Sequence, residues 1–243
     1  MEEMELKKKS LTDKTIHFWY CDFNQNKNRL DSFHSILSTD ERARSGKFKF
    51  EKDRDCYIIS RGILRLLLGS YLDMKAKDIK FKYTSYGKPI LDFESNLKFN
   101  VSHSGNRAAF AFFRNTEIGV DIEKIKYDFD VLELAQNFFS KKEIEVLERQ
   151  SEENLPAAFF RCWTRKESFI KAEGSGLSFP LDKFAVSLEN DEEAKLLETQ
   201  WNLKEKVEWN LFSFKPASDY IAAVAVRNHV TKISYYDWDE LSS

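Results

Sequence analysis

Three carboxylates and one ammonium group lie in two short stretches of the chain and could together hold a cation and a phosphate. The stretches are Ile118-Gly-Val-Asp121-Ile-Glu123 and Trp163-Thr-Arg-Lys-Glu167-Ser-Phe-Ile-Lys171. If the first stretch is a strand, Asp121 and Glu123 share one face of it. If the second is a helix, Glu167 and Lys171 lie one turn apart on the same side. The spacing therefore predicts three oxygen ligands beside one fixed positive charge.

Such a set of ligands favours a hard divalent cation. Carboxylates bind Mg²⁺, Mn²⁺ or Ca²⁺, with water and phosphate oxygens completing the shell. Zinc is disfavoured, because the histidines and cysteines do not cluster. Simpler interpretations stay open: Asp121 and Glu123 could form a solvated strand face, and Glu167 with Lys171 a surface ion pair.

A small polar loop could hold phosphate oxygens. Ser102-His103-Ser104-Gly105 offers hydroxyls, an imidazole and flexible backbone amides, although a tight turn with a capping serine would use the same residues. A nucleophilic triad is not indicated, since no serine or cysteine lies in an elbow-like setting. Arg61, Lys88 and the basic segment 42–49 could neutralise further phosphates, or could simply cover exposed helix faces.

The elements that must position these residues follow from hydrophobic patterning. Ser38 with Glu41, and Ser140 with Glu143, each form a helix-start signature followed by an amphipathic helix, the first of which Gly69 could end. Alternating or apolar runs predict strands near residues 16–23, 108–113, 118–123 and 220–226.

The second half of the chain resembles the first. The two helix starts are matched by two similar apolar strands, Ala108-Ala-Phe-Ala-Phe112 and Ala222-Ala-Val-Ala-Val226. We therefore expect two copies of one α+β unit, residues 1–118 and 119–243, with the site between them.

Composition limits the classes of function. A chain of 243 residues with 42% hydrophobic and 32% charged residues is typical of a globular protein. The net charge of −2 gives no support for binding nucleic acid. No signal peptide or membrane span is evident, and the three widely spaced cysteines predict neither disulfides nor a zinc site. We expect a cytoplasmic protein.

Six motifs in a fixed order resemble the Sfp-type 4′-phosphopantetheinyl transferases. They are Tyr86-Gly-Lys-Pro89, Asn100-Val-Ser-His-Ser-Gly105, Ile118-Gly-Val-Asp-Ile-Glu123, Phe138-Phe-Ser-Lys-Lys-Glu143, Trp163-Thr-Arg-Lys-Glu-Ser-Phe-Ile-Lys171 and Gly174-Ser-Gly-Leu-Ser178. The resemblance extends from about residue 16 to residue 226.

The resemblance implies a fold and a reaction. The fold would be α+β, with two similar α/β subdomains related by a pseudo-twofold axis and the active site at their interface. With Mg²⁺ or Mn²⁺, the protein would transfer the phosphopantetheine arm of coenzyme A to a serine of an apo acyl or peptidyl carrier protein and release 3′,5′-ADP. The carrier would serve fatty acid, polyketide or nonribosomal peptide synthesis. A monomer is expected, because two repeats in one chain complete the site.

The resemblance also implies roles for single residues. Asp121, Glu123 and Glu167 would bind the metal, and Lys171 would stabilise the pyrophosphate or the leaving group. The coenzyme would contact four further residues of the matched motifs, Lys88, Pro89, Ser102 and His103. Related enzymes tend to have an arginine where this chain has Cys56, so Arg61, or else Arg54, is the substitute expected to bind the 3′-phosphate.

Two questions stay open at this stage. The serine must lose a proton, and either Glu167 or Glu143 could accept it; Glu167 is preferred, although a carboxylate bound to metal is a poorer base. The alternative functions are a non-catalytic coenzyme A binding module and a metal-dependent nucleotide phosphohydrolase. The three acids with Lys171 argue against the first, and the lack of ligands for a second metal argues against the other.

Overall fold

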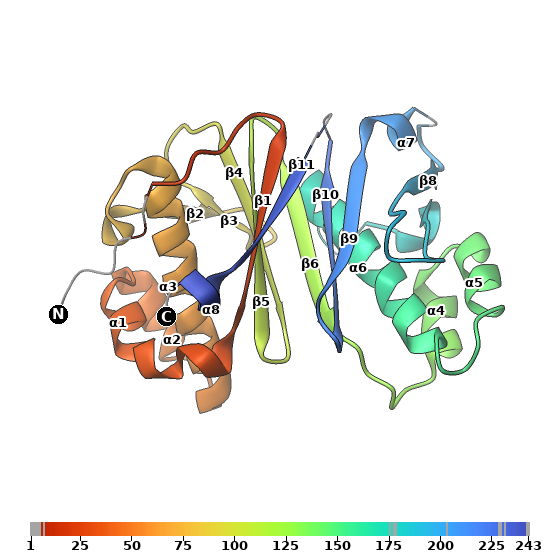
Figure 1. The fold of residues 1–243 in the computed structure, drawn as a ribbon, viewed down its shortest axis with the longest axis horizontal. Helices are drawn as coiled ribbons and strands as arrows, with labels where there is room; N and C mark the ends of the chain where they lie inside the picture. Colours follow the sequence, from red (N-terminus) through yellow and green to blue (C-terminus); the bar gives the residue numbers. More distant parts are fainter. Residues whose placement is uncertain are drawn as a thin grey trace.

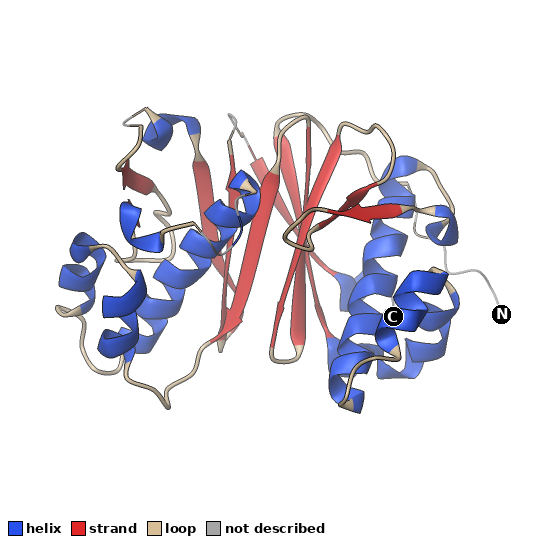
Figure 2. Ribbon diagram, turned by 180° about the vertical axis from the view of Figure 1, so that it is seen from behind, coloured by secondary structure: helices blue, strands red, loops and turns tan. Residues whose placement is uncertain are grey.

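Two sheets lie side by side in the middle of the molecule, and helices cover their outer faces (Figures 1 and 2). The computed structural model describes residues 6, 8–174, 176, 179–202, 204–227, 230 and 232–241. The expected mixture of helices and sheets is confirmed.

The first half supplies a helical layer around the long helix α3 and three strands of one sheet, whose order is β11-β1-β5-β4; the edge strand β11 comes from the end of the chain. Its elements are β1 (Thr15–Asp22), η1 (Phe23–Arg29), α1 (Leu30–Ser35), α2 (Thr39–Ser45), α3 (Glu51–Leu72), η2 (Ala76–Asp78), β2 (Phe81–Tyr83), β3 (Pro89–Leu91), β4 (Leu97–Ser104) and β5 (Arg107–Arg114). The short strands β2 and β3 pair with each other as a separate hairpin.

The second half supplies the sheet β6-β10-β9, against which α6 packs. Its elements are β6 (Ile118–Lys124), α4 (Val131–Phe138), α5 (Lys141–Leu147), α6 (Leu155–Glu173), η4 (Leu181–Lys183), β7 (Phe184–Val186), β8 (Leu196–Thr199), α7 (Glu205–Glu208), β9 (Asn210–Ala217), β10 (Tyr220–Val226), β11 (Lys232–Asp237) and α8 (Trp238–Leu241).

The helix starts match the prediction, but one helix end does not. Capping boxes join Ser38 to Glu41 and Ser140 to Glu143. The prediction that Gly69 ends α3 is wrong, because the helix continues to Leu72 and ends at Asp73, which has a φ of 58°. Gly69 serves close packing instead, since a Cβ there would lie 2.7 Å from the carbonyl oxygen of Met74.

The last strand of the chain returns to the first half. β11 pairs in parallel with β1, and the buried Trp238 that follows it donates a hydrogen bond from Nε1 to Asn26 Oδ1 at 3.0 Å. The division at residues 1–118 and 119–243 stays a prediction. Strand β11 belongs to the second part by sequence but pairs with a strand of the first part.

An apolar core lies between the two sheets. One face of β6 joins it through Ile118, Val120 and Ile122, which pack with side chains of β1, β5 and β10. Because side chains of a strand alternate between its two faces, Gly119, Asp121 and Glu123 are left on the opposite face. The predicted division of this strand into an apolar and an acidic face is confirmed.

Candidate functional site

The acidic strand β6 and the helix α6 approach each other closely. A Cβ atom at Gly119 would lie 2.0 Å from the carbonyl oxygen of Ser168 and 2.5 Å from the amide nitrogen of Ala172. Only glycine therefore permits this spacing, which brings the last turns of α6 against the face of β6 that carries Asp121.

Asp121 is the centre of a polar cluster. The residue is 2% exposed, and its Oδ1 accepts hydrogen bonds from Lys171 Nζ at 2.6 Å and from Ser102 Oγ at 2.8 Å. Lys171 Nζ also lies 3.1 Å from Ser102 Oγ. The other carboxylate oxygen, Asp121 Oδ2, is buried and has no hydrogen-bond partner.

Glu167 is held in an environment that disfavours its charged form. It is buried, and its Oε1 has no hydrogen-bond partner. Burial, followed by the charges of Asp121 and Glu123, raises the pKa of Glu167 to about 7, while Lys171 opposes this shift. The charges of Asp121 and Glu123 thus act on Glu167, because carboxylates that share a site resist full ionisation.

Glu123 is the third acid and lies toward the outer end of the same strand. Its Oε2 accepts a hydrogen bond from Ser104 Oγ at 2.6 Å. Burial and the nearby charge of Asp121 raise the pKa of Glu123, and the Ser104 hydrogen bond works in the opposite direction. Glu123 is therefore close to Asp121 but oriented by a different serine.

Strand β4 lines the opposite side of the acids with alternate polar residues. Asn100 Oδ1 accepts a hydrogen bond from the backbone N–H of Val120 at 2.9 Å, and Ser102 and Ser104 contact Asp121 and Glu123. Sequence reasoning did not assign Asn100 this function. The alternation Asn-x-Ser-x-Ser within a strand was the available signal, because it places all three side chains on one face.

His103 lies on the same strand between these serines and is exposed. Loss of hydration around the ring and the positive charge of Lys171 lower the pKa of His103. The imidazole is therefore neutral at pH 7 and offers both a donor and an acceptor at the edge of the cluster.

Lys88 connects the β2–β3 hairpin to the end of α6. Its Nζ donates to Glu117 Oε2 at 3.0 Å and to the carbonyl oxygen of Lys171 at 3.1 Å. Lys88 and Pro89 line a pocket of about 600 Å³, whose wall also includes Glu167 and Lys171. The motif Gly174 to Ser178 borders this pocket with Gly174 and Gly176, but its residues 175, 177 and 178 lie outside the described part.

Two predicted site residues have other partners. Glu143 is 1% exposed, and it accepts hydrogen bonds from the backbone N–H groups of Ser140 and Val186 at 2.8 Å each and pairs with Lys166 at 2.9 Å. These contacts give Glu143 a structural function and do not support it as a base. Arg61 Nε lies 3.4 Å from Glu41 Oε1, while Arg61 Nη1 is buried without a partner.

The donor set fits a hard cation, although it is not arranged around one. Among the described residues, no three His, Cys, Asp or Glu side chains converge as a ready-made metal site. A buried polar atom without a partner costs about 1–3 kcal/mol, and Asp121 Oδ2 and Glu167 Oε1 are two such oxygens in one cluster. A divalent cation such as Mg²⁺ would satisfy both of them.

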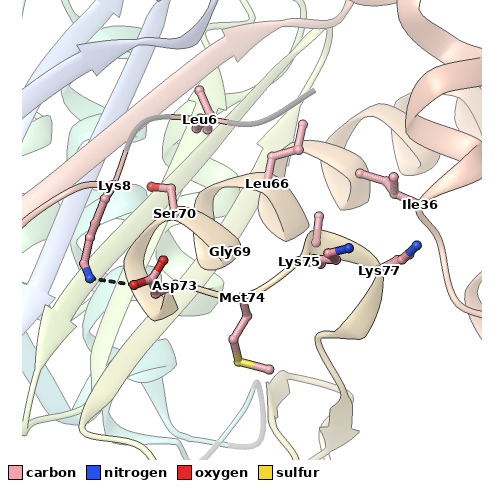
Figure 3. A pocket seen from close by; sticks show the side chains of 11 residues that line it. Leu6, Lys8, Ile36, Leu66, Gly69, Ser70, Asp73, Met74, Lys75 and Lys77 are labelled. Carbon is pink, nitrogen blue, oxygen red and sulfur yellow. Dashed lines mark hydrogen bonds and ion pairs between the residues drawn. The ribbon is translucent and has the colours of Figure 1, made fainter. Parts of the chain in front are cut away.

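A second cavity lies at the end of α3 (Figure 3). It has a volume of about 230 Å³ and is lined by Leu66 and Ser70 on the helix and by Asp73, which pairs with Lys8 at 2.7 Å. It lacks the cluster of acids found beside α6. In the described part of the chain, no helix is long and apolar enough to cross a membrane.

Comparisons with known proteins agree with this geometry. Residues 117–225 match the 4′-phosphopantetheinyl transferase superfamily, and residues 22–113 match the N-terminal region of 4′-phosphopantetheinyl transferases. The chain is 37% identical to 4′-phosphopantetheinyl transferase HetI of Nostoc sp. over 89% of this chain and 90% of that protein. It is 35% identical to 4′-phosphopantetheinyl transferase Sfp of Bacillus subtilis over 72% and 77%. The mouse L-aminoadipate-semialdehyde dehydrogenase-phosphopantetheinyl transferase is 30% identical over 85% and 73%.

Proposed function

The chain belongs to the 4′-phosphopantetheinyl transferase superfamily, and on that premise we propose that it transfers the 4′-phosphopantetheine arm of coenzyme A to a serine of an apo carrier protein, releasing 3′,5′-ADP. One observation carries the proposal: buried, unpartnered oxygens of Asp121 and Glu167 lie in one cluster with the Lys171 ammonium. This arrangement suits a ligand that brings both a divalent cation and phosphates.

The three acids would hold Mg²⁺ or Mn²⁺ through Asp121, Glu123 and Glu167. When bound, the cation would neutralise charge on the phosphate oxygens. The chain's own residues do the rest. Lys171 supplies a positive charge for the leaving phosphate, which carries more negative charge in the transition state than in the ground state. Ser102 and Ser104 hold two of the acids in place by donating to them.

The attacking serine hydroxyl must lose its proton, and we assign this step to Glu167, directly or through water. A carboxylate with a pKa near 7 is a suitable base at neutral pH. Metal binding would lower the pKa of Glu167, so the metal and the serine proton compete for the same carboxylate. Glu143 is a poorer candidate, because its oxygens already accept hydrogen bonds from Ser140 and Val186.

Coenzyme A would lie along the pocket beside α6. Lys88 and Pro89 line this pocket, while Ser102 and His103 present polar groups from β4, and Arg61 remains our candidate for the 3′-phosphate. All of these residues come from one chain, which supports a monomer. The three cysteines are free, which supports a reducing, cytoplasmic location.

The test is a mass measurement on the acceptor. We would incubate the protein with coenzyme A, Mg²⁺ and each of several apo carrier domains, from fatty acid, polyketide and nonribosomal peptide systems. The proposal predicts that at least one carrier gains one phosphopantetheine arm. Bound coenzyme A without transfer to any carrier would instead favour a binding module. Nucleotide released without a carrier would favour a phosphohydrolase.

A further inference from the structure

The ammonium of Lys171 lies beside a buried carboxylate that needs a positively charged partner. Its Nζ contacts Asp121 Oδ1 at 2.6 Å, and Asp121 is the most buried of the three acids. This is a shorter contact than its distance of 3.1 Å to Ser102 Oγ. The ammonium therefore acts as a counter-ion for the carboxylate most costly to leave unpaired.

One ammonium cannot neutralise this cluster. Asp121, Glu123 and Glu167 can carry up to three negative charges, whereas Lys171 brings one positive charge and pairs with Asp121. A divalent cation would neutralise the acids better and could bind Asp121 Oδ2, which has no partner. It would then share one carboxylate with the Lys171 ammonium on Oδ1, and two cations held so close repel each other.

On the basis of the proposed function, we propose that Lys171 is an internal substitute for the divalent cation. In the free protein its ammonium pairs with Asp121 Oδ1, and its charge opposes binding of the metal at the unpartnered Oδ2. The ammonium would leave Asp121 when a phosphate of the coenzyme offers it a new partner. Metal and coenzyme would then bind with positive cooperativity.

The helix is built so that only the side chain of Lys171 needs to move. Its carbonyl oxygen accepts a hydrogen bond from Lys88 Nζ at 3.1 Å, and Gly119 lets β6 pack directly on the helix backbone at this turn. The Lys171 side chain is 29% exposed, and it borders the pocket assigned to the coenzyme. A flexible lysine stem can thus reach the pocket while the backbone stays fixed.

Calorimetric titration of the free protein with Mn²⁺, without coenzyme A, tests this inference. Lys171→Met should bind the metal at least about tenfold more tightly than the wild type, because no ammonium then repels the metal at Asp121. Lys171→Gln is a second neutral variant that can still donate to Asp121, in case the methionine variant folds poorly. Adding 3′,5′-ADP should then tighten metal binding in the wild type more than in either variant.

Lys126→Met is the matched control. Lys126 is exposed and its charge acts on Glu123, but no contact joins it to Asp121. The Lys126→Met variant measures the general effect of removing one positive charge near the acids. We expect its affinity for Mn²⁺ to rise less than about threefold. Equal metal affinities in the wild type and the Lys171 variants, or an equal gain in Lys126→Met, would overturn the inference.

The inference and the proposed function fail in different ways. If the wild type modifies a carrier but the Lys171 variants bind Mn²⁺ no better, the inference is wrong and the function stands. If no carrier is modified but Lys171→Met binds Mn²⁺ more tightly, Lys171 is a metal substitute in a protein of another activity.

Discussion

The two halves of the molecule hold their long helices with the same contacts. Arg65 on α3 pairs with Glu41 at 2.6 Å, and Lys166 on α6 pairs with Glu143 at 2.9 Å. Each glutamate belongs to the capping box of the short helix before the long one. A buried cation and a capping carboxylate thus fix the helix in both halves.

The correspondence continues into the turn after each helix. Arg65 donates to the carbonyl oxygens of Ala76, the first residue of η2, and Ile79, the residue after it. Lys166 donates in the same way to the carbonyl oxygens of Leu181, the first residue of η4, and Phe184, the residue after it. The two helices also end alike, at Asp73 and Gly174, both in the left-handed conformation. These shared contacts support the predicted duplication.

The two halves differ in the side chains that lie between the long helix and the sheet. When Arg65 is matched with Lys166, Leu66 corresponds to Glu167 and Ser70 corresponds to Lys171. In the first half the space is filled by aromatic rings, and Tyr71 Oη accepts a hydrogen bond from Trp19 Nε1 at 2.8 Å. In the second half Gly119 lets α6 pack directly on β6, and the acids lie beside this contact. The helix contacts are common to both halves, and the acidic cluster belongs to the second half.

The cavities show the same division. The pocket beside α6 is bordered by Glu167 and Lys171, and the smaller cavity beside α3 is bordered at the equivalent positions by Leu66 and Ser70 (Figure 3). Equivalent positions of the two long helices therefore border a cavity in both halves, and only on α6 do these positions carry a carboxylate and an ammonium.

The largest expected effect is on Glu167. Glu167→Gln should lower the rate of carrier modification by about 10²–10⁴-fold, because it removes a metal ligand and the assigned base. The melting temperature should not fall, since the ionised carboxylate is already disfavoured where it lies. Transfer rates come from the mass of the carrier against time. Wild-type activity in Glu167→Gln would remove its assigned role.

The shared contacts should matter equally in both halves. Glu41→Gln and Glu143→Gln should each lower the free energy of unfolding by about 3 kcal/mol, because each leaves a buried cation without its carboxylate. Denaturant unfolding measures both effects. If only one variant is destabilised, the two contact sets are not equivalent in energy.

Close packing of α6 should matter next. Gly119→Ala should cost about 1–3 kcal/mol of stability, because its Cβ would overlap the backbone of α6. Carrier modification should slow as well, because the helix carrying Glu167 would shift. Gly46→Ala is the control, since its Cβ would have no neighbour closer than 3.7 Å. Equal stability of the two variants would contradict the close contact.

The smallest effect concerns pH. Glu167 has a pKa of about 7 in the folded protein against an ordinary value of 4.5, so the folded state holds its proton more tightly. Stability from this group is present at low pH and is lost as pH rises from about 4.5 to 7. Glu167→Gln should escape this loss and gain on the order of 1–3 kcal/mol relative to the wild type by pH 8, measured with a metal chelator present. No change with pH would mean that Glu167 is not held in a disfavoured charged state.

Much of the site could be predicted from local sequence, because it depends on side-chain periodicity. The faces of β6 and the shared turn of α6 follow directly from the positions of Asp121, Glu123, Glu167 and Lys171. What could not be predicted depends on tertiary contacts. Nothing in the local pattern shows that the carboxylate of Glu143 would pair with Lys166 and accept a hydrogen bond from Val186.

Long-range pairing was equally hidden from local patterns. The return of β11 to β1 joins the two ends of the chain, and neither strand contains a signal that names its partner. Gly69 looked like a helix end, but its lack of a side chain serves packing against the Met74 carbonyl. Such contacts are set by the whole fold and not by the residues beside them.

The central claim is that the chemistry belongs to the acids of the second half and not to the equivalent positions of the first. The most direct test compares carrier modification by the wild type, by Asp121→Asn/Glu123→Gln/Glu167→Gln, and by Leu66→Met, a volume-conserving change at the position equivalent to Glu167. We predict that the carrier gains the arm with the wild type and with Leu66→Met, and no arm with the triple variant. Transfer by a folded triple variant at the wild-type rate would contradict the account.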